Sequence, residues 1–352
     1  MTDPASPLAS FADPGTVSHF RYEIGETYLG DPVEIPVSIV EGSDDGPTGF
    51  VTAAVHGDEL NGVKVAQRVA ATVDPEALHG RLVVVHVVNV PGFLAQQRYI
   101  PIYDQDMNRS FPGSPTSNTA ERMAHEIYDT FVAHADFGLD FHTSTRNRTT
   151  MYHVRADVTD DDVDALARSF GANIILQGAG EDGSLRKVAT DAGIPTITVE
   201  MGRAHRFQRP LIERAVDGVR SVLAERGMLP EETVSWPGWY KVMSADNERR
   251  WIRAPVGGLV DMEWGPTPLV HEDEPICTIT DHFGREEHVV RAPFTGIIVG
   301  ILENPVALPG HPLGHLVRLD PGTRDEIEAE IERGEFDGYR SYGFQWSGTE
   351  DD

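Results

Sequence analysis

Between residues 33 and 225, short apolar runs alternate with longer stretches in which apolar residues recur at helical spacing. The short runs are rich in β-branched residues and predict strands at residues 33–41, 49–55, 81–90, 137–143 and 196–202. The longer stretches predict amphipathic helices at residues 61–73, 119–135, 160–170 and 207–226. Near-continuous apolar strands separated by helices are typical of a sheet covered on both faces. We therefore expect an α/β fold with a mixed, largely parallel sheet.

The pattern changes after a Pro-containing segment at residues 227–237, where short strands separated by Gly and Pro replace the helices. Residues 252–260 (IRAPVGGLV) match residues 290–298 (VRAPFTGII) at an offset of 38 residues. Two related half-units predict a small pseudo-symmetric β-barrel or sandwich, similar to a biotinyl/lipoyl-type module. Such modules carry their group on a lysine. Because residues 242–352 contain no lysine, we do not expect a carrier.

Three segments are expected from this pattern. Residues 1–235 would form the catalytic α/β domain and residues 236–323 the β module. Residues 324–352 would form an acidic tail that is helical in part.

The charge balance is strongly acidic, with 56 Asp and Glu against 29 Lys and Arg and a formal net charge of −27. Three of the basic residues are lysines, at Lys64, Lys187 and Lys241. A surface rich in carboxylates and poor in lysine suits a cytosol of very high salt, where screening weakens self-repulsion. An ordinary acidic protein is the alternative. Under either interpretation the chain has no basic patch that could bind phosphates, so nucleic acid is not an expected partner.

The cysteine content and the hydropathy of the chain limit its expected covalent links, metal ligands and cellular location. Cys277 is the only cysteine, which excludes an intrachain disulfide and a zinc site built on cysteines. The first 15 residues lack the basic and apolar regions of a signal peptide, and no apolar run reaches the ~18 residues of a membrane span. We expect a cytoplasmic protein with no membrane partner.

Polar residues gather where the predicted strands end. His56-Gly57-Asp58-Glu59 follows one strand, Asp140 and His142 close another, and Glu200 ends an otherwise apolar run. His56, Glu59 and His142 form a set of two histidines and one carboxylate, which commonly holds catalytic zinc with one position open. Glu200 is then the candidate for moving a proton, and Asp140 could orient His142 as an acceptor.

Each of these residues also has an ordinary structural explanation. His56 could be a hydrogen-bonded core residue and Glu59 a favourable carboxylate at a helix N-terminus. His142 could lie at the surface, and Glu200 could form an ion pair with Arg203. The recurrence of such residues at successive strand ends favours a common site.

The order of four motifs is specific: HGDE at residue 56, DQDMNRSFPG at 104, DFHTS at 140, and Glu200 closing a strand before a glycine. In this order they resemble the succinylglutamate desuccinylase/aspartoacylase family of the zinc carboxypeptidase-like superfamily. The resemblance covers residues 30–225 by motif and, in kind, the β module. It implies His56, Glu59 and His142 as ligands of one Zn²⁺ per chain, and Glu200 as general base and acid.

The resemblance also implies a set of substrate contacts. Asn108 and Arg109 would grip a substrate carboxylate, with Asp106 orienting a neighbour. Arg98 would polarise the scissile carbonyl, and Arg186 would read a second carboxylate. The tyrosine that carboxypeptidases place over the substrate has no match; Tyr240 and Trp264 stay open as candidates.

The expected activity is zinc-dependent hydrolysis of the amide bond in a small N-acylated amino acid or amine that carries a carboxylate. A metallocarboxypeptidase on the same fold and, from a different class, a non-catalytic binding protein are the alternatives. Association of the chain into a homo-oligomer is left open.

Overall fold

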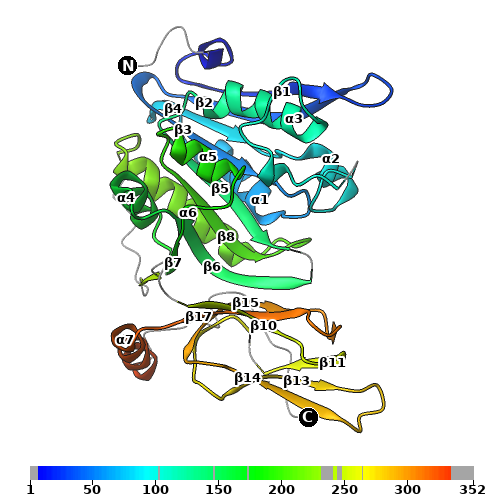
Figure 1. Cartoon of the computed structure of the whole chain (residues 1–352). Coiled ribbons are helices and arrows are strands. Elements are labelled where there is room, and N and C mark those ends of the chain that lie inside the picture. Colours follow the sequence, from blue (N-terminus) through cyan, green and yellow to red (C-terminus); the bar gives the residue numbers. More distant parts are fainter. Residues whose placement is uncertain are drawn as a thin grey trace, which may run out of the picture.

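The computed structural model describes residues 7–101, 104–145, 147–172, 174–230, 241–243, 248–263 and 265–333. Figure 1 shows two lobes, an upper one built by strands and helices up to β8 and a lower one built mainly of strands from β10 onward. None of the described helices combines the length and the apolar character that crossing a bilayer requires.

The strands of the upper lobe are β1 (Thr16–Glu26), β2 (Pro32–Glu41), β3 (Asp44–Ala53), β4 (His79–Val85), β5 (Phe137–Ser144), β6 (Arg148–Ala156), β7 (Ile174–Gln177), β8 (Thr196–Arg203) and β9 (Lys241–Met243). Those of the lower lobe are β10 (Arg249–Arg253), β11 (Gly258–Met262), β12 (Thr267–Val270), β13 (Pro275–Thr280), β14 (Glu287–Arg291), β15 (Gly296–Leu302), β16 (Val306–Ala307) and β17 (Pro312–Arg318).

The helices are α1 (Asn61–Thr72), α2 (Val90–Ala95), α3 (Thr119–Ile127), α4 (Asp161–Ser169), α5 (Leu185–Asp191), α6 (Arg209–Glu225) and α7 (Pro321–Glu332). Short helical turns occur at η1 (Pro7–Ser10) and η2 (Met107–Arg109), and η3 (Tyr128–Val132) is a π-helical turn that follows α3. The stretch predicted as one helix at 119–135 is therefore an α-helix continued by a turn of different pitch.

The upper sheet confirms the predicted mixed α/β architecture. Five of the eight pairings among β1 to β9 are parallel, and the order β4-β3-β5-β8 forms the parallel centre. β1, β2 and β6 attach by antiparallel pairing. The hydrophobic pattern missed β1, β6 and β7.

Helices cover both faces of this sheet, as expected. One core packs α1, α4 and α6 against strand residues such as Leu139 and Val199. The other packs α3 and α5 against Phe50 and Val83 on the opposite face. Since Leu139 and Phe141 point into the first core, the intervening Asp140 and then His142 point to the face of α3 and α5.

The lower lobe contains two sheets whose strand order repeats. One sheet runs β14-β13-β11-β16, and β10-β17-β15 with β12 paired to β15 forms the other. The sequence repeat aligns β10 with β14 and β11 with β15. Under the same alignment, the strand order β10-β17-β15-β12 corresponds to the order β14-β13-β11-β16. The internal repeat at residues 252–260 and 290–298 is thus a structural repeat, with a shared apolar core.

The two lobes are continuous through hydrogen-bonded strands. β15 pairs antiparallel with β6 through Gly300↔Thr150 and its neighbours, so one 13-stranded sheet extends into the lower lobe. Arg203 at the end of β8 also forms a 2.6 Å ion pair with Glu303, just after β15. The expected boundary at residue 235 and most of the expected tail lie outside the described residues, as do Tyr240 and Trp264.

Candidate active site

Three parallel neighbouring strands bring the predicted residues to one edge of the sheet. β3, β5 and β8 lie side by side, and their carboxyl ends lead to His56, His142 and Glu200. His142 and Glu200 are register partners, so their side chains leave the same face. The carboxyl edge of an α/β sheet is where ligands commonly bind.

The segment between β3 and α1 is a tight turn, and α1 begins only at Asn61. The Glu59 backbone N–H donates to the carbonyl of His56 at 3.1 Å, which fixes the spacing of these two residues. Gly57 packs so closely on α2 that a Cβ atom would lie 2.0 Å from the carbonyl carbon of Gly92. This turn therefore holds His56 and Glu59 in place.

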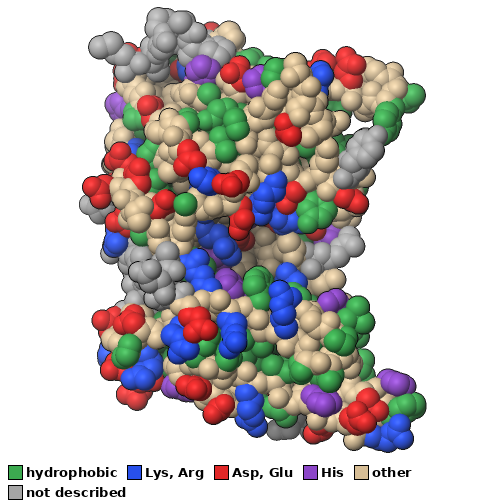
Figure 2. Space-filling view, viewed as in Figure 1, with side chains coloured by type: hydrophobic (Ala, Val, Ile, Leu, Met, Phe, Trp, Pro, Cys, Tyr) green, Lys and Arg blue, Asp and Glu red, His purple; other side chains and the backbone are tan. Residues whose placement is uncertain are grey.

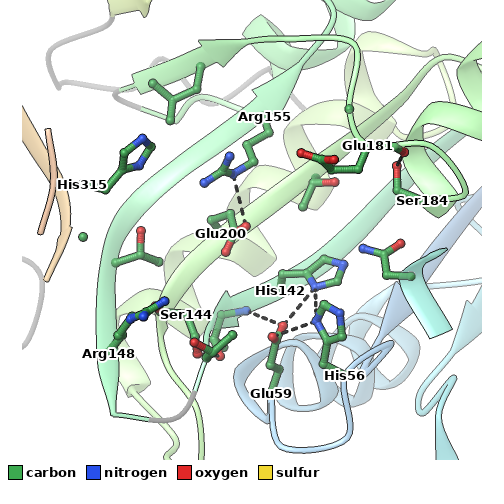
Figure 3. Close-up of a pocket in the computed structure, with 18 of the residues that line it drawn as sticks. His56, Glu59, His142, Ser144, Arg148, Arg155, Glu181, Ser184, Glu200 and His315 are labelled. Atoms are coloured by element: carbon green, nitrogen blue, oxygen red, sulfur yellow. Dashed lines mark hydrogen bonds and ion pairs between the residues drawn. The ribbon is translucent and has the colours of Figure 1, made fainter. Parts of the chain in front are cut away.

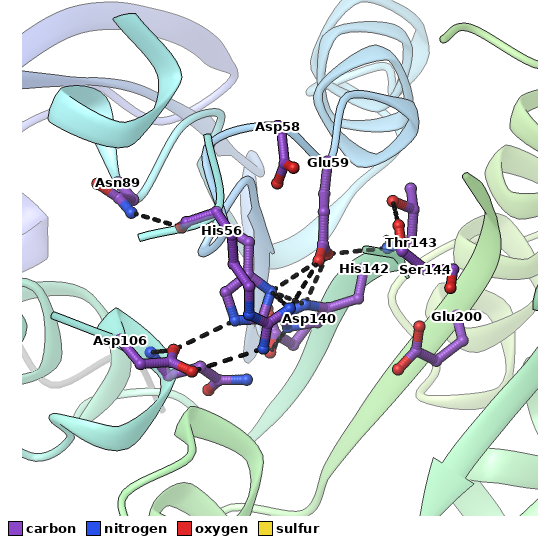
Figure 4. A network of polar contacts seen from close by, with 12 residues as sticks. His56, Asp58, Glu59, Asn89, Asp106, Asp140, His142, Thr143, Ser144 and Glu200 are labelled. Atoms are coloured by element: carbon purple, nitrogen blue, oxygen red, sulfur yellow. Dashed lines mark hydrogen bonds and ion pairs between the residues drawn. The ribbon is translucent and has the colours of Figure 1, made fainter. Parts of the chain in front are cut away.

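The ligand atoms of three residues converge between these elements (Figure 4). His56 Nδ1 lies 2.8 Å from Glu59 Oε1, His142 Nδ1 lies 2.9 Å from Glu59 Oε2, and the two Nδ1 atoms are 3.2 Å apart. Tetrahedral zinc with ligands at ~2.0–2.1 Å separates them by about 3.3 Å. The donor types and the spacing therefore fit one zinc ion.

Each histidine turns its second nitrogen toward a carboxylate. His142 Nε2 lies 2.8 Å from Asp140 Oδ2, and Thr52 donates to the other Asp140 oxygen at 2.7 Å. His56 Nε2 lies 3.3 Å from Asp106 Oδ1. Such acceptors favour a proton on Nε2 and leave Nδ1 free to bind a cation.

The charges of this cluster are strongly coupled. Burial by itself raises the pKa of Glu59, but His56 and His142 outweigh burial and hold the pKa well below its usual range. Burial alone lowers the pKa of His142, whereas Asp140 and Glu59 raise it well above its usual value. The site thus favours a proton on His142, beside the Glu59 carboxylate. A bound metal ion would take the place of that proton.

Arg98 lies against the same cluster. Its Nη1 atom is 3.2 Å from His56 Nδ1 and 3.3 Å from Glu59 Oε1, and Nη2 is 3.5 Å from Asp106. The guanidinium is therefore within reach of a polar atom bound beside these three residues.

The loop at residues 104–113 reaches the cavity through η2. Asp106 caps this turn by accepting from the Asn108 N–H at 2.9 Å. The Asn108 side-chain oxygen accepts from the Leu185 N–H at 3.0 Å, which leaves its amide N–H groups available. Arg109 is exposed and donates to the Asn108 carbonyl at 2.7 Å; among the described residues it forms no ion pair with Asp104 or Asp106.

Arg186 lies on α5 and is 7% exposed. It donates from Nη1 to the Gly178 carbonyl at 2.8 Å. Burial and the nearby Arg155 lower the pKa of Arg186 to about 10. A buried guanidinium in this position favours an anionic neighbour.

Glu200 has a different partner from the one considered from the sequence. Its Oε1 atom lies 3.2 Å from Arg155 Nε on β6, while Arg203 pairs with Glu303. Figure 3 shows Glu200 between Arg155 and the group formed by His56, Glu59 and His142. Glu200 is thus close to the metal position without contacting its ligands.

A cavity of about 480 Å³ extends to the lower lobe, and the site residues that line it are His56, Glu59, Arg98, Asn108, Arg109, His142, Arg186 and Glu200. Its lining includes side chains that the sequence did not single out, namely Arg148, Arg155, Glu181, Arg249, Trp251 and His315. Arg148 and Arg155 lie on β6, a strand missed by the pattern, and the last three come from the lower lobe. The alternation in RTTMYHVRA at residues 148–156 was the one local signal for such a strand.

The catalytic-domain model of the succinylglutamate desuccinylase/aspartoacylase family matches residues 45–226, just over half of the chain. The chain belongs to the succinylglutamate desuccinylase/aspartoacylase family. Membership confirms the resemblance seen in the four motifs.

Individual proteins are also similar to this chain in sequence or in structure. N-alpha-acetyl-L-2,4-diaminobutyric acid deacetylase of Halomonas elongata is 33% identical over 129 residues, and the match spans 37% of each chain. The product-bound ectoine utilization protein EutE (DoeB) of Ruegeria pomeroyi has a TM-score of 0.78 at 23% identity, over 87% of this chain and 97% of that one. A succinylglutamate desuccinylase/aspartoacylase of Rhodobacter sphaeroides gives 0.76 at 22%, over 88% and 97%. These structures share the fold of both lobes.

Proposed function

We propose that the protein is a zinc-dependent amidohydrolase that removes the acyl group from a small N-acylated amino acid. The observation that supports this most directly is the convergence of His56 Nδ1, His142 Nδ1 and the Glu59 carboxylate within 3.2 Å of one another. This donor set lies in the same cavity as Glu200, Arg98 and the loop with Asn108 and Arg109.

In this proposal His56, Glu59 and His142 hold the ion, which would supply Lewis-acid activation of water and of the amide carbonyl. Glu200 accepts the proton of the attacking water and transfers it to the leaving nitrogen. Arg98 donates to the carbonyl oxygen as negative charge develops there. Asp140 and Asp106 hold the two imidazole rings in orientation.

Asn108 and Arg109 anchor the carboxylate of the substrate. The exposed Arg109 guanidinium offers a fork that matches a carboxylate, and the Asn108 amide offers further N–H donors. The absence of an ion pair between Arg109 and Asp104 or Asp106, both described residues, supports this role over a purely structural one.

The curated relative deacetylates an N-acetylated diamino acid, as its name states. We therefore expect an N-acetyl amino acid among the substrates. Short acyl groups such as formyl, acetyl and succinyl all fit a cavity of about 480 Å³.

The test is a hydrolysis screen of N-formyl, N-acetyl and N-succinyl amino acids beside short peptides, with the metal content measured and molar salt present. Release of amino acids from acylated substrates by protein with one zinc per chain supports the proposal. Preferential cleavage of peptides would identify a carboxypeptidase instead. Zinc-loaded protein that hydrolyses neither class would indicate a binding protein.

A further inference from the structure

The cavity between the lobes has the opposite charge to the molecule as a whole. Six arginines line it against three glutamates, although acidic residues outnumber basic ones by 56 to 29 in the chain. The arginines are Arg98, Arg109, Arg148, Arg155, Arg186 and Arg249. Figure 2 shows basic side chains gathered around the boundary between the lobes. Such a concentration of positive charge points to an anionic ligand.

Two of these arginines meet at the end of β7, and Arg155 lies on the neighbouring strand β6, opposite Leu176 of β7. Arg186 donates to the Gly178 carbonyl at 2.8 Å, and Arg249 from β10 of the lower lobe donates to the adjacent Gln177 carbonyl. Among the described residues, no carboxylate lies within ion-pair distance of either guanidinium. The buried Nε atom of Arg249 also has no hydrogen-bond partner there.

Mutual repulsion is evident in this group. Burial and then Arg155 lower the pKa of both Arg186 and Arg249. Burial, Arg155 and Arg249 also lower the pKa of the neighbouring His315 to about 4, so this histidine is neutral at physiological pH. An anion held among these guanidinium groups would relieve the repulsion.

Arg155 has one carboxylate partner among the described residues, and the contact is loose. Its Nε atom lies 3.2 Å from Glu200 Oε1 but is not oriented to donate a hydrogen bond. The two side chains are 37% and 17% exposed. Ion pairs with this degree of exposure contribute little stability, so an incoming anion can compete for Arg155.

We propose that Arg155 and Arg249, together with Arg186, form an anion subsite at the boundary of the lobes, where a bound anionic group replaces Glu200 as the partner of Arg155. The exchange frees the Glu200 carboxylate to accept the proton of water. Occupation of the subsite therefore raises the rate of the chemical step in addition to the affinity. Arg249 makes the lower lobe a direct participant in recognition.

This inference rests on the proposed deacylase function. The ligand chemistry is a carboxylate or a similar small anion, separate from the carboxylate held by Asn108 and Arg109. It can come from a second acidic group on the substrate or from a free anion in solution.

Three matched substrates separate these sources. N-acetylglutamine has one carboxylate, N-acetylglutamate adds one on the amine side, and N-succinylglutamine adds one on the acyl side. The assay uses zinc-loaded full-length protein at constant high ionic strength in the salt of a bulky sulfonate, with sodium formate added as a free anion. We expect at least one doubly charged substrate to exceed N-acetylglutamine in kcat by roughly tenfold, a part of the ~10²–10⁴-fold due to general base catalysis. We also expect formate to raise kcat for N-acetylglutamine in a saturable manner.

Variants then locate the effect. Arg249→Met should bring the kcat ratio between charged and neutral substrates close to one and abolish activation by formate. Arg249→Lys should retain part of both, since it preserves the charge. Arg250→Met removes a charge from the next residue of β10, which is exposed and does not line the cavity, and should leave the ratio unchanged.

The outcomes are distinguishable. A charge preference seen only in KM, no activation by formate, or a full kcat ratio in zinc-loaded Arg249→Met would each overturn the subsite. Failure of the wild type to hydrolyse all three substrates and the rest of the acyl screen would instead overturn the proposed function.

Discussion

The Nδ1 atoms of His56 and His142 lie 3.2 Å apart, although 86 positions separate the two residues in the chain. Parallel pairing of β3 with β5 brings these strand ends together, and the turn at Gly57 adds Glu59 to the pair. Since Asp140 and Asp106 engage the opposite ring nitrogens, two nitrogen donors and a carboxylate face a common point. The following predictions examine this arrangement and its surroundings.

Replacing His142 with alanine should lower the zinc content to well under one per chain. Two remaining ligands hold the ion poorly, while the buried strands around the site still pack. Metal analysis of purified protein and circular dichroism measure the two effects. His134→Ala, at an exposed position, serves as the control and should retain full zinc. One tightly held zinc in His142→Ala would remove this residue from the ligand set.

Glu200→Gln should keep the zinc but lose most of the turnover. The amide fills the same space yet cannot accept a proton, and general base catalysis commonly contributes ~10²–10⁴-fold. The measurement is kcat with metal content determined on the same sample. Glu181→Gln, which removes another carboxylate from the cavity lining, should change kcat far less. Near wild-type turnover in zinc-loaded Glu200→Gln would exclude Glu200 as the base.

Arg109→Lys should impair hydrolysis of substrates with a free carboxylate. Lysine offers a point charge in place of a fork, and hydrogen bonds to charged groups contribute ~1.5–3 kcal/mol, so kcat/KM should fall by about 10–100-fold. The same substrate with its carboxylate amidated should be poor for the wild type and nearly unaffected by the change. Equal losses for acid and amide forms would mean that Arg109 maintains the loop and that the carboxylate binds elsewhere.

Low salt should destabilise the protein. The net charge is −27, and the Debye length increases from ~3 Å at 1 M to ~10 Å at 0.1 M, so carboxylates across the surface begin to repel one another. The melting temperature should therefore fall steadily as sodium chloride is reduced between these limits. A melting temperature that does not change with salt would contradict the halophilic interpretation.

The single thiol should be unreactive in the folded protein. Cys277 is fully buried between β11 and β14, and burial followed by the charge of Glu263 raises its pKa to about 12. At pH 8 the thiol is then almost entirely protonated, and the thiolate is the reactive form. Iodoacetamide should label the protein only after denaturation. Rapid labelling of the native protein at pH 8 would show that the lower lobe opens.

The candidate metal site could be proposed from the sequence because its signals are local. His142 and Glu200 close apolar strands, and His56 and Glu59 lie in the turn that follows another. A buried polar group in such a place is costly without a partner. The roles of Arg98, Asn108 and Arg109 came from motif resemblance, and the structure places all three around the same cavity.

The partner of Glu200 could not be predicted in this way. Arg203, three residues away, was the nearest candidate in the chain, but it pairs with Glu303 after β15. Arg155 reaches Glu200 because β6 pairs antiparallel with β8, a pairing between strands more than 40 residues apart in sequence. Local patterns carry no information about which strand takes the neighbouring position in a sheet.

Three features follow from local patterns in the sequence, because periodicity and burial act over a few neighbouring positions. They are the alternation of strands and helices, the repeat in the lower lobe and the polar residues at the strand ends. The complete fold was needed to show that β15 extends the upper sheet through β6, and that Arg249 and His315 therefore line the same cavity as His142. These relationships depend on hydrogen bonds and packing between distant segments, whose pairing is set by the whole fold and not by the local pattern.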